Sequence, residues 1–229
     1  MCISETWSSS KEEARMDGYK YEHNPIYYNR DLTIFDKKSL TKVGGVGIYI
    51  MNGLDHEKLK IENQPVQDLP LANSEHLWVK LNHQNVVVGV IYRHPRDTIE
   101  ELRRFAIDFI KIIHKLAEKS LKFYIFGDFN INLLENSYFN ECLCYMLHKH
   151  GCKQIITRPT RKAPKKAATL LDHIYTNDEI GNIKESGIIY PSIKDHHPTY
   201  CVVNSLRQGT GERPDSLPQL EKHFHNLAL

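Results

Sequence analysis

The run at residues 86–92 (VVVGVIY) places the strongest limit on how this chain can fold, because it is apolar at nearly every position. A strand with one face in water alternates apolar and polar side chains, so this run is expected to form a central β-strand covered on both faces. Residues 76–81 (HLWVKL) alternate as a half-buried strand does. The polar residues 83–85 between the two runs predict a hairpin.

An amphipathic helix is predicted at residues 98–119. Thr98 is a suitable N-cap, and two glutamates follow in the first turn. Residues 123–126 (FYIF) then predict a short buried strand that ends at Gly127. The apolar positions of the helix recur with a period of about 3.6 residues; they are Ile99, Leu102, Phe105, Phe109, Ile112, Ile113 and Leu116.

The remaining patterns predict further strands and one more helix, and together they indicate an α/β fold. The expected strands are residues 44–51, 170–175, 187–190 and 199–203, and the expected helix is residues 138–150. Hairpins mixed with one strand–helix–strand passage favour a sandwich of two packed sheets with helices outside. Residues 1–204 are expected to form one domain, and the polar, proline-containing residues 205–229 a weakly ordered tail.

Composition excludes several classes of protein. With 41% apolar and 25% charged residues the chain has the make-up of a globular domain, and its net charge of +2 does not by itself imply a nucleic-acid partner. The five cysteines show no CxxC pairing, and the start of the chain lacks a signal peptide, so a reduced compartment, nucleus or cytoplasm, is expected rather than secretion. No apolar run approaches the ~20 residues that cross a bilayer, so no membrane partner is expected.

Polar residues stand at or beside the ends of the apolar strands. Strands that end together can present such side chains at one mouth. Each residue also has an ordinary explanation: an Asp–His pair often stabilises a turn, a strand often ends in Gly-Asp, and a tyrosine often lies at the edge of a core. The residues in question are Glu5, Tyr92, Arg93, Asp128, Asn130, Asp172, Asp195 and His196.

These residue types match the needs of phosphodiester hydrolysis. A carboxylate such as Glu5 can hold Mg²⁺ or Mn²⁺, which prefer oxygen ligands. A histidine held by a carboxylate, His196 with Asp172, can act as a base. Asp128 and Asn130 would position the water and the phosphate, and Tyr92 and Arg93 would donate hydrogen bonds to the phosphate.

A basic segment precedes the expected strand at residues 170–175. Residues 153–166 contain no acidic residue, and two prolines make a helix there unfavourable. The segment is either a solvated loop or a phosphate-contacting surface that would make DNA binding depend on salt. Its basic residues are Lys153, Arg158, Arg161, Lys162, Lys165 and Lys166.

Taken together, six stretches resemble the endonuclease/exonuclease/phosphatase superfamily and, within it, the endonuclease domains of LINE-type (non-LTR) retrotransposons. The TRPTR stretch at residues 157–161 supports the latter branch. The resemblance covers roughly residues 3–204. The stretches are SETW (residues 4–7), GGVGIYI (44–50), GVIYRHP (89–95), GDFNINL (127–133), TLLDHIYT (169–176) and KDHHP (194–198).

This resemblance implies a four-layer, DNase I-like α/β sandwich and a role for each matching residue. Glu5 and Asp195 resemble the metal-binding carboxylates. The catalytic set would be Tyr92 for phosphate contact, Asp128 for orienting water, Asn130 for phosphate, and Asp172 holding the histidine, His196. The resemblance further implies Mg²⁺ or Mn²⁺, DNA as partner, a monomer, and a cut that leaves a 3′-hydroxyl for a reverse transcriptase domain of the same polyprotein.

Three departures from the family pattern leave alternatives open. The family's first strand, which ends in an asparagine, is missing, so the chain is expected to be truncated at its N-terminus. Lys194 replaces the usual serine before Asp195, and no reverse transcriptase follows. One alternative is therefore a non-catalytic relic that binds DNA or protein, and another is a phosphatase of the same superfamily.

Overall fold

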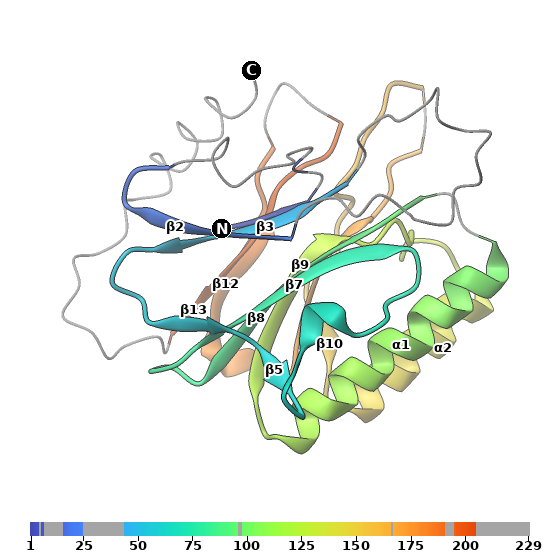
Figure 1. The fold of residues 1–229 in the computed structure, drawn as a ribbon. Coiled ribbons are helices and arrows are strands. Elements are labelled where there is room, and N and C mark those ends of the chain that lie inside the picture. Colours follow the sequence, from blue (N-terminus) through green and yellow to red (C-terminus); the bar gives the residue numbers. More distant parts are fainter. Residues whose placement is uncertain are drawn as a thin grey trace, which may run out of the picture.

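The computed structural model describes residues 1–4, 6, 16–24, 44–95, 98–165, 167–190 and 195–204. At its centre is a six-stranded sheet (Figure 1). Strands β8 and β9 are parallel and the other neighbours are antiparallel. The order across the sheet is β10 (Lys153–Gln154), β11 (Asp172–Thr176), β9 (Lys122–Asp128), β8 (Val86–Arg93), β7 (Ser74–Leu81) and β4 (His56–Lys58).

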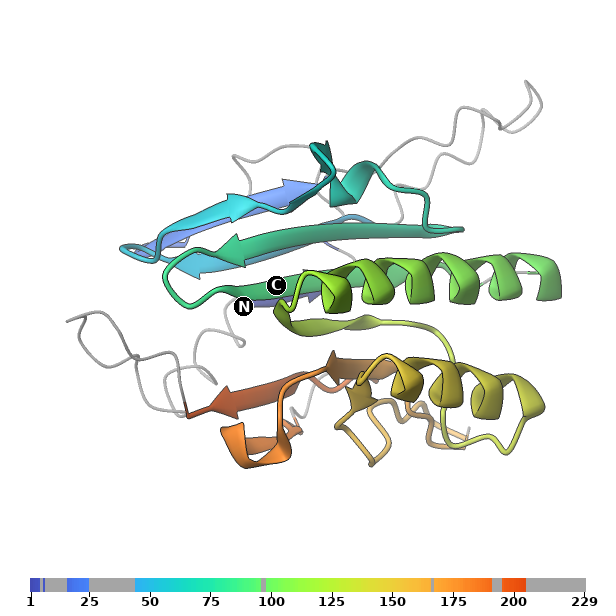
Figure 2. The same ribbon diagram turned by 90° about the horizontal axis from the view of Figure 1, so that it is seen from below.

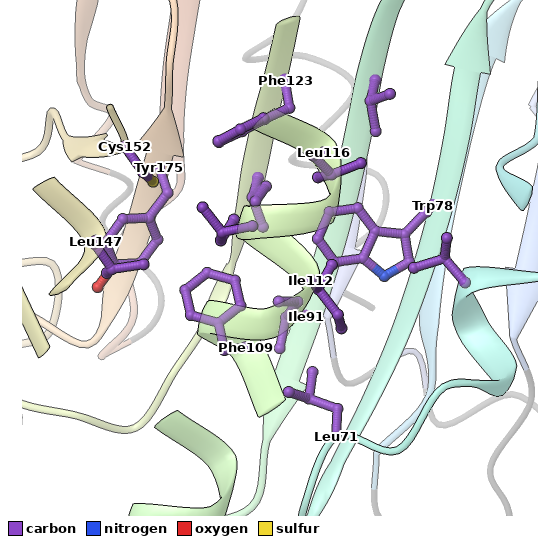
Figure 3. Packing of buried hydrophobic residues seen from close by; sticks show 14 of the residues in the cluster. Leu71, Trp78, Ile91, Phe109, Ile112, Leu116, Phe123, Leu147, Cys152 and Tyr175 are labelled. Atoms are coloured by element: carbon purple, nitrogen blue, oxygen red, sulfur yellow. The ribbon is translucent and has the colours of Figure 1, made fainter. Parts of the chain in front are cut away.

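Helices α1 (Ile99–Glu118) and α2 (Tyr138–Lys149) cover one face of this sheet. Thr98 and Glu101 form a reciprocal capping box that starts α1, as the sequence predicted for Thr98. The apolar side of α1 packs on the sheet around the indole of Trp78, as Figure 3 shows. Burial of this apolar surface fixes the helices against the sheet.

A second, smaller sheet packs on the opposite face of the central sheet. It has the order β1 (Cys2–Ser4), β3 (Val46–Met51) and β2 (Tyr19–Asn24), all antiparallel. Side chains alternate along a strand, so Leu77 and Val79 of β7 face this sheet while Trp78 between them faces the helices.

Strands β12 (Ile183–Ile188) and β13 (Thr199–Val203) form a hairpin that lies on the opposite side of the molecule from β2 and β3 (Figure 2). It packs near β11 through a small cluster that contains Ile174. The remaining elements are β5 (Lys60–Ile61), β6 (Gln64–Pro65) and the 3-10 helices η3 (Val66–Asp68) and η4 (Ile180–Asn182).

The expected α/β class with two packed sheets and outer helices is confirmed, although both described helices lie on the same face. The strand expected at residues 187–190 instead spans Ile183–Ile188, because Lys184 and Glu185 sit on its exposed side and gave no apolar signal. Neither described helix combines the length and apolar character that crossing a membrane requires. The tail expected at residues 205–229 lies outside the described residues.

Candidate active site

One row of side chains crosses the central sheet near one end. Glu75 of β7 pairs in register with Tyr92 of β8, Tyr92 pairs with Asp128 of β9, and Asp128 pairs with Asp172 of β11. Directly opposed residues point to the same face, and here that face is the one covered by β3 and by the β12–β13 hairpin. Strand register therefore gathers three carboxylates and a tyrosine that are far apart in sequence.

His196 joins this row and completes a cluster with two of the carboxylates. Its Nδ1 lies 3.1 Å from Oδ2 of Asp172 and 4.0 Å from Oδ2 of Asp128. Ligand atoms of Asp128, Asp172 and His196 all lie within 4.8 Å of one another, and among the described residues this carboxylate–histidine cluster is the one group of three suited to a metal ion. Asp128 is only 4% exposed, whereas the other two are half-buried.

The electrostatics of the carboxylate–histidine cluster favour a charged imidazole. Burial alone would lower the pKa of His196, but the hydrogen bond that its Nδ1 donates to Asp172, the charge of Asp172 and the charge of Asp128 together outweigh it. The pKa of His196 is therefore raised above its ordinary value of 6.5. A histidine with this environment accepts a proton readily and holds it beside two carboxylates.

The turn after β9 is built around Asp128 and Asn130. The backbone N–H of Asn130 donates to Oδ1 of Asp128, and Asn130 adopts a positive φ of 47° that asparagine tolerates well. The side-chain amide of Asn130 donates to the carbonyl of Arg93. Arg93 is buried, and its guanidinium donates to the carbonyls of Phe129 and Asn130. These bonds lock the end of β8 to the turn that carries Asp128.

Gly127 lets β9 approach β8 closely enough to align Tyr92 with Asp128. Its φ is +152°, and a Cβ at this position would overlap the carbonyl oxygen of Ile91. Only glycine fits such a close backbone approach. The glycine of the GDFN stretch thus has a packing reason independent of the chemistry beside it.

Thr160 ties the two halves of the candidate base together and was not singled out by the sequence. Its Oγ1 accepts from the backbone N–H groups of Leu171 and Asp172, and its carbonyl accepts from the N–H of His197. Thr160 is fully buried. Thr160 therefore holds both Asp172 and the residue next to His196 in place. No periodic pattern in the sequence distinguishes Thr160 from its neighbours.

Asp195, expected beside the metal, forms an ion pair with Arg161 instead of joining the carboxylate–histidine cluster. Oδ2 of Asp195 lies 2.9 Å from Nε of Arg161, and this bond lowers the pKa of Asp195. The N–H of Lys162 also donates to the carbonyl of Asp195. Through Arg161 and Lys162, the basic segment that begins at Lys153, called the basic loop below, is attached to the segment that carries His196.

The rest of the basic loop lies at the surface beside this attachment. Arg158, Lys162 and Lys165 are exposed, and Lys153 is half-buried in β10. His173, which neighbours Asp172, is fully buried and stacks on Phe129, so it belongs to the core. Three residues weighed from the sequence lie outside the described residues, and they are Glu5, Lys166 and Lys194.

Glu75 is a second residue of the site that the sequence did not mark. It is buried inside β7, where a lone glutamate within an alternating strand looks like an ordinary solvent-facing residue. Only the register with Tyr92 shows that it shares a row with Asp128 and Asp172.

Comparison with known proteins gives matches in structure and none in sequence. No protein-family model matches the chain. No curated protein sequence matches it. The endonuclease domain of TRAS1, a telomere-specific non-LTR retrotransposon, aligns at 12% identity and a TM-score of 0.51 over 80% of this chain and 77% of that domain.

Two further solved structures align over more of both chains. The 3′-5′ exonuclease NExo from Neisseria meningitidis has a TM-score of 0.62 at 12% identity over 89% of this chain and 88% of its own. An AP endonuclease from Archaeoglobus fulgidus has a TM-score of 0.61 at 12% identity, with the same coverage. The chain thus has the DNase I-like fold of endonuclease/exonuclease/phosphatase proteins, as the resemblance of its motifs implied.

Proposed function

We propose that this chain is a divalent-metal-dependent endonuclease that hydrolyses phosphodiester bonds in DNA. The observation that carries the proposal is the carboxylate–histidine cluster of Asp128, Asp172 and His196 at the end of two packed sheets. The fold shared with nucleases adds support, and one of those neighbours, NExo, is described with a product DNA hairpin bound.

In the proposed mechanism His196 takes the proton of the attacking water, because Asp172 orients its imidazole and raises its pKa. Because Nδ1 of His196 faces Asp172, Nε2 would take the proton, and Asp128, which opposes Asp172 in register, would help to orient the water. Asn130, fixed by its bonds to Asp128 and Arg93, would contact the phosphate, as would Tyr92 in the same row.

The donor set fits a hard divalent cation. Asp128 offers buried carboxylate oxygens, which suit Mg²⁺ or Mn²⁺ better than softer metals. Asp172 lies close enough to share the ion, and we propose Glu5 as a further ligand. Asp195, expected as a ligand, pairs with Arg161 instead. When bound, such an ion stabilises negative charge that develops on the phosphate oxygens.

The biological role that we propose is nicking of target DNA by a non-LTR retroelement. The nick would leave a 3′-hydroxyl that primes reverse transcription by a polymerase domain of the same polyprotein. We propose a monomeric enzyme that acts in the nucleus or the cytoplasm. The contacts to DNA would come from the exposed residues of the basic loop; Arg93, expected to contact phosphate, is instead buried and donates to the carbonyls of Phe129 and Asn130. The fold shared with the TRAS1 endonuclease domain supports this role.

A plasmid assay tests the proposal. Supercoiled plasmid incubated with the chain and Mg²⁺ should be converted to the open circle, and chelation of the metal should stop the conversion. Asp128→Ala and His196→Ala should each abolish nicking while the thermal unfolding midpoint stays close to that of the parent. Asp108→Ala on α1 is the matched control, since Asp108 pairs with Lys111 on the helix surface. Nicking by either site variant at the parent rate would refute the assignment.

A phosphatase is the second candidate, because the Neisseria neighbour is also described as a 3′ phosphatase. A duplex with a 3′-phosphate at a pre-formed nick separates the two reactions: a phosphatase releases inorganic phosphate from it, whereas an endonuclease cuts intact duplex and leaves an end that a DNA polymerase extends directly. A chain that binds DNA but does neither, with or without Mg²⁺, would be the non-catalytic relic.

A further inference from the structure

Glu75 and His94 form a second carboxylate–histidine pair at the same end of the sheet. Nε2 of His94 lies 2.9 Å from Oε1 of Glu75. Glu75 stands one strand beyond Tyr92 in the row that continues to Asp128 and Asp172. The pair therefore lies on the opposite side of Tyr92 from the carboxylate–histidine cluster.

The carboxylate of Glu75 is held in a way that ordinary fold stability does not explain. It is 8% exposed, and its Oε2 is buried with no hydrogen-bond partner among the described residues. A Cβ on Gly44, whose φ is +105°, would lie 2.7 Å from that oxygen, so the glycine makes room for the carboxylate. A buried acceptor left without a donor costs about 1–3 kcal/mol, and such groups are retained mainly where they serve a site.

His94 is the member of the pair that reaches the surface. Its side chain is 27% exposed against 9% for Glu75, and its ring meets the edge of the Tyr92 ring at 5.0 Å between centroids. Its backbone N–H donates to the carbonyl of Asn73, which fixes the chain just after β8. A histidine that is protonated between a carboxylate and a phosphate donates from both ring nitrogens, one to each anion.

We propose, building on the proposed nuclease function, that His94 binds a backbone phosphate next to the cut and that Glu75 is its positioning residue. Glu75 is two strands from Asp128, or about 10 Å at the usual strand spacing. Successive phosphates of one DNA strand advance about 3.4 Å along the helix axis. The phosphate bound by His94 thus lies within about three nucleotides of the scissile bond, on one side only.

The test combines a protein change with a change in single phosphates. Duplexes carrying one neutral methylphosphonate are prepared, one for each of the three phosphates on either side of a mapped nick. For the parent enzyme, a methylphosphonate at one of these positions should raise KM about tenfold, as expected for loss of one charge-assisted hydrogen bond. His94→Ala should raise KM similarly on unmodified DNA and leave kcat within about twofold. The methylphosphonate at the sensitive position should not raise the KM of His94→Ala any further.

Variants of Glu75 separate positioning from stability. Glu75→Ala should raise KM as His94→Ala does, and the double variant should be no worse than either. Glu75→Gln keeps an oxygen that accepts from His94 and should restore most of the parent KM. His114→Ala is the matched control, because His114 forms a comparable pair with Glu118 on α1, far from the row.

Each outcome decides one of the two proposals. Suppose that the parent nicks DNA and that His94→Ala has the parent's KM, or responds to every methylphosphonate as the parent does. Either result overturns the inference and leaves the nuclease proposal intact. A parent that binds duplex without nicking overturns the nuclease proposal, and the inference is then tested by dissociation constants, which His94→Ala must raise about tenfold and His114→Ala must leave unchanged. A parent that neither binds nor nicks overturns both proposals.

Discussion

Thr160 shows how a single uncharged residue can decide whether a base and its orienting carboxylate meet. Its hydroxyl and carbonyl bind backbone groups on both sides of the Asp172–His196 pair. Because Thr160 accepts from N–H groups at or next to both members of the pair, replacing it should displace the backbone at both Asp172 and His196. The positions of Asp172 and His196 thus depend on Thr160, which carries no charge.

Replacing Thr160 by valine should destabilise the fold and impair nicking together. Valine has the same shape but leaves the N–H groups of Leu171 and Asp172 without their acceptor, at about 1–3 kcal/mol for each donor. Thr160→Ser keeps the hydroxyl and should stay within about 1 kcal/mol of the parent. Urea unfolding and plasmid nicking measure both effects, and a valine variant as stable and active as the serine variant would contradict this role.

The raised pKa of His196 predicts the acid limb of the pH profile. As a base His196 must be neutral, so kcat/KM should fall as pH drops below that raised pKa. Asp172→Asn keeps an oxygen that can accept from His196 but removes the charge that raises this pKa, so the limb should move to lower pH while the maximum rate falls about 10²-fold or more. An acid limb that stays in place would show that His196 is not the titrating base.

The raised pKa of His196 also makes the free energy of unfolding depend on pH, and stability changes in the opposite direction to activity. A raised pKa in the folded state stabilises the fold most below the ordinary value of 6.5, and this stabilisation is lost as pH rises through the raised pKa.

At the scale of elements, regular patterns were predictable from the sequence and register was not. The apolar run of β8 and the period of α1 gave both elements almost to the residue, because burial on one side or on both leaves a clear pattern. β2 (YKYEHN) is polar and half-exposed, and it was missed. Asp128 and His196 were found at strand ends, but Glu75 needed the register of β7 against β8, which depends on long-range pairing.

The close approach of β8 and β9 predicts that Gly127→Ala is severely destabilising, by about 4 kcal/mol or more. The added methyl group would meet the backbone of Ile91, which cannot rotate away as a side chain can. Gly53→Ala is the control, since Gly53 also has a positive φ, +91°, but its Cβ would meet no atom of the described residues within 4 Å. Denaturant unfolding should show a far smaller loss for Gly53→Ala, about 1–2 kcal/mol. Equal losses would contradict the packing argument.

The basic loop predicts a salt-dependent contribution to DNA binding. Replacing Arg158, Lys162 and Lys165 by glutamine should weaken binding and reduce the slope of log K against log salt by about 0.9 for each phosphate that is no longer neutralised. The control replaces Lys111, Lys115 and Lys119, which belong to α1 and its C-cap on the far face of the sheet. A slope that changes equally in both triple variants would make the loop a solvated surface that does not touch DNA.

For the whole molecule, the sandwich explains why the reactive residues gather at one end. The space between the central sheet and the outer strands is filled by apolar side chains along most of its length. The row from Glu75 to Asp172 replaces that apolar filling with carboxylates near one end, where His196 and the basic loop also arrive. With a net charge of only +2, the proposed attraction to DNA would have to come from this local arrangement rather than from the molecule as a whole.

Binding of Mn²⁺, followed by electron paramagnetic resonance, tests most directly whether Asp128, Asp172 and His196 form one centre. The parent should bind a Mn²⁺ ion that Mg²⁺ displaces, Asp128→Ala and Asp172→Ala should each weaken that binding at least about tenfold, and Asp108→Ala on α1 should leave it unchanged. Equal Mn²⁺ affinity in the parent and in both site variants would contradict the account.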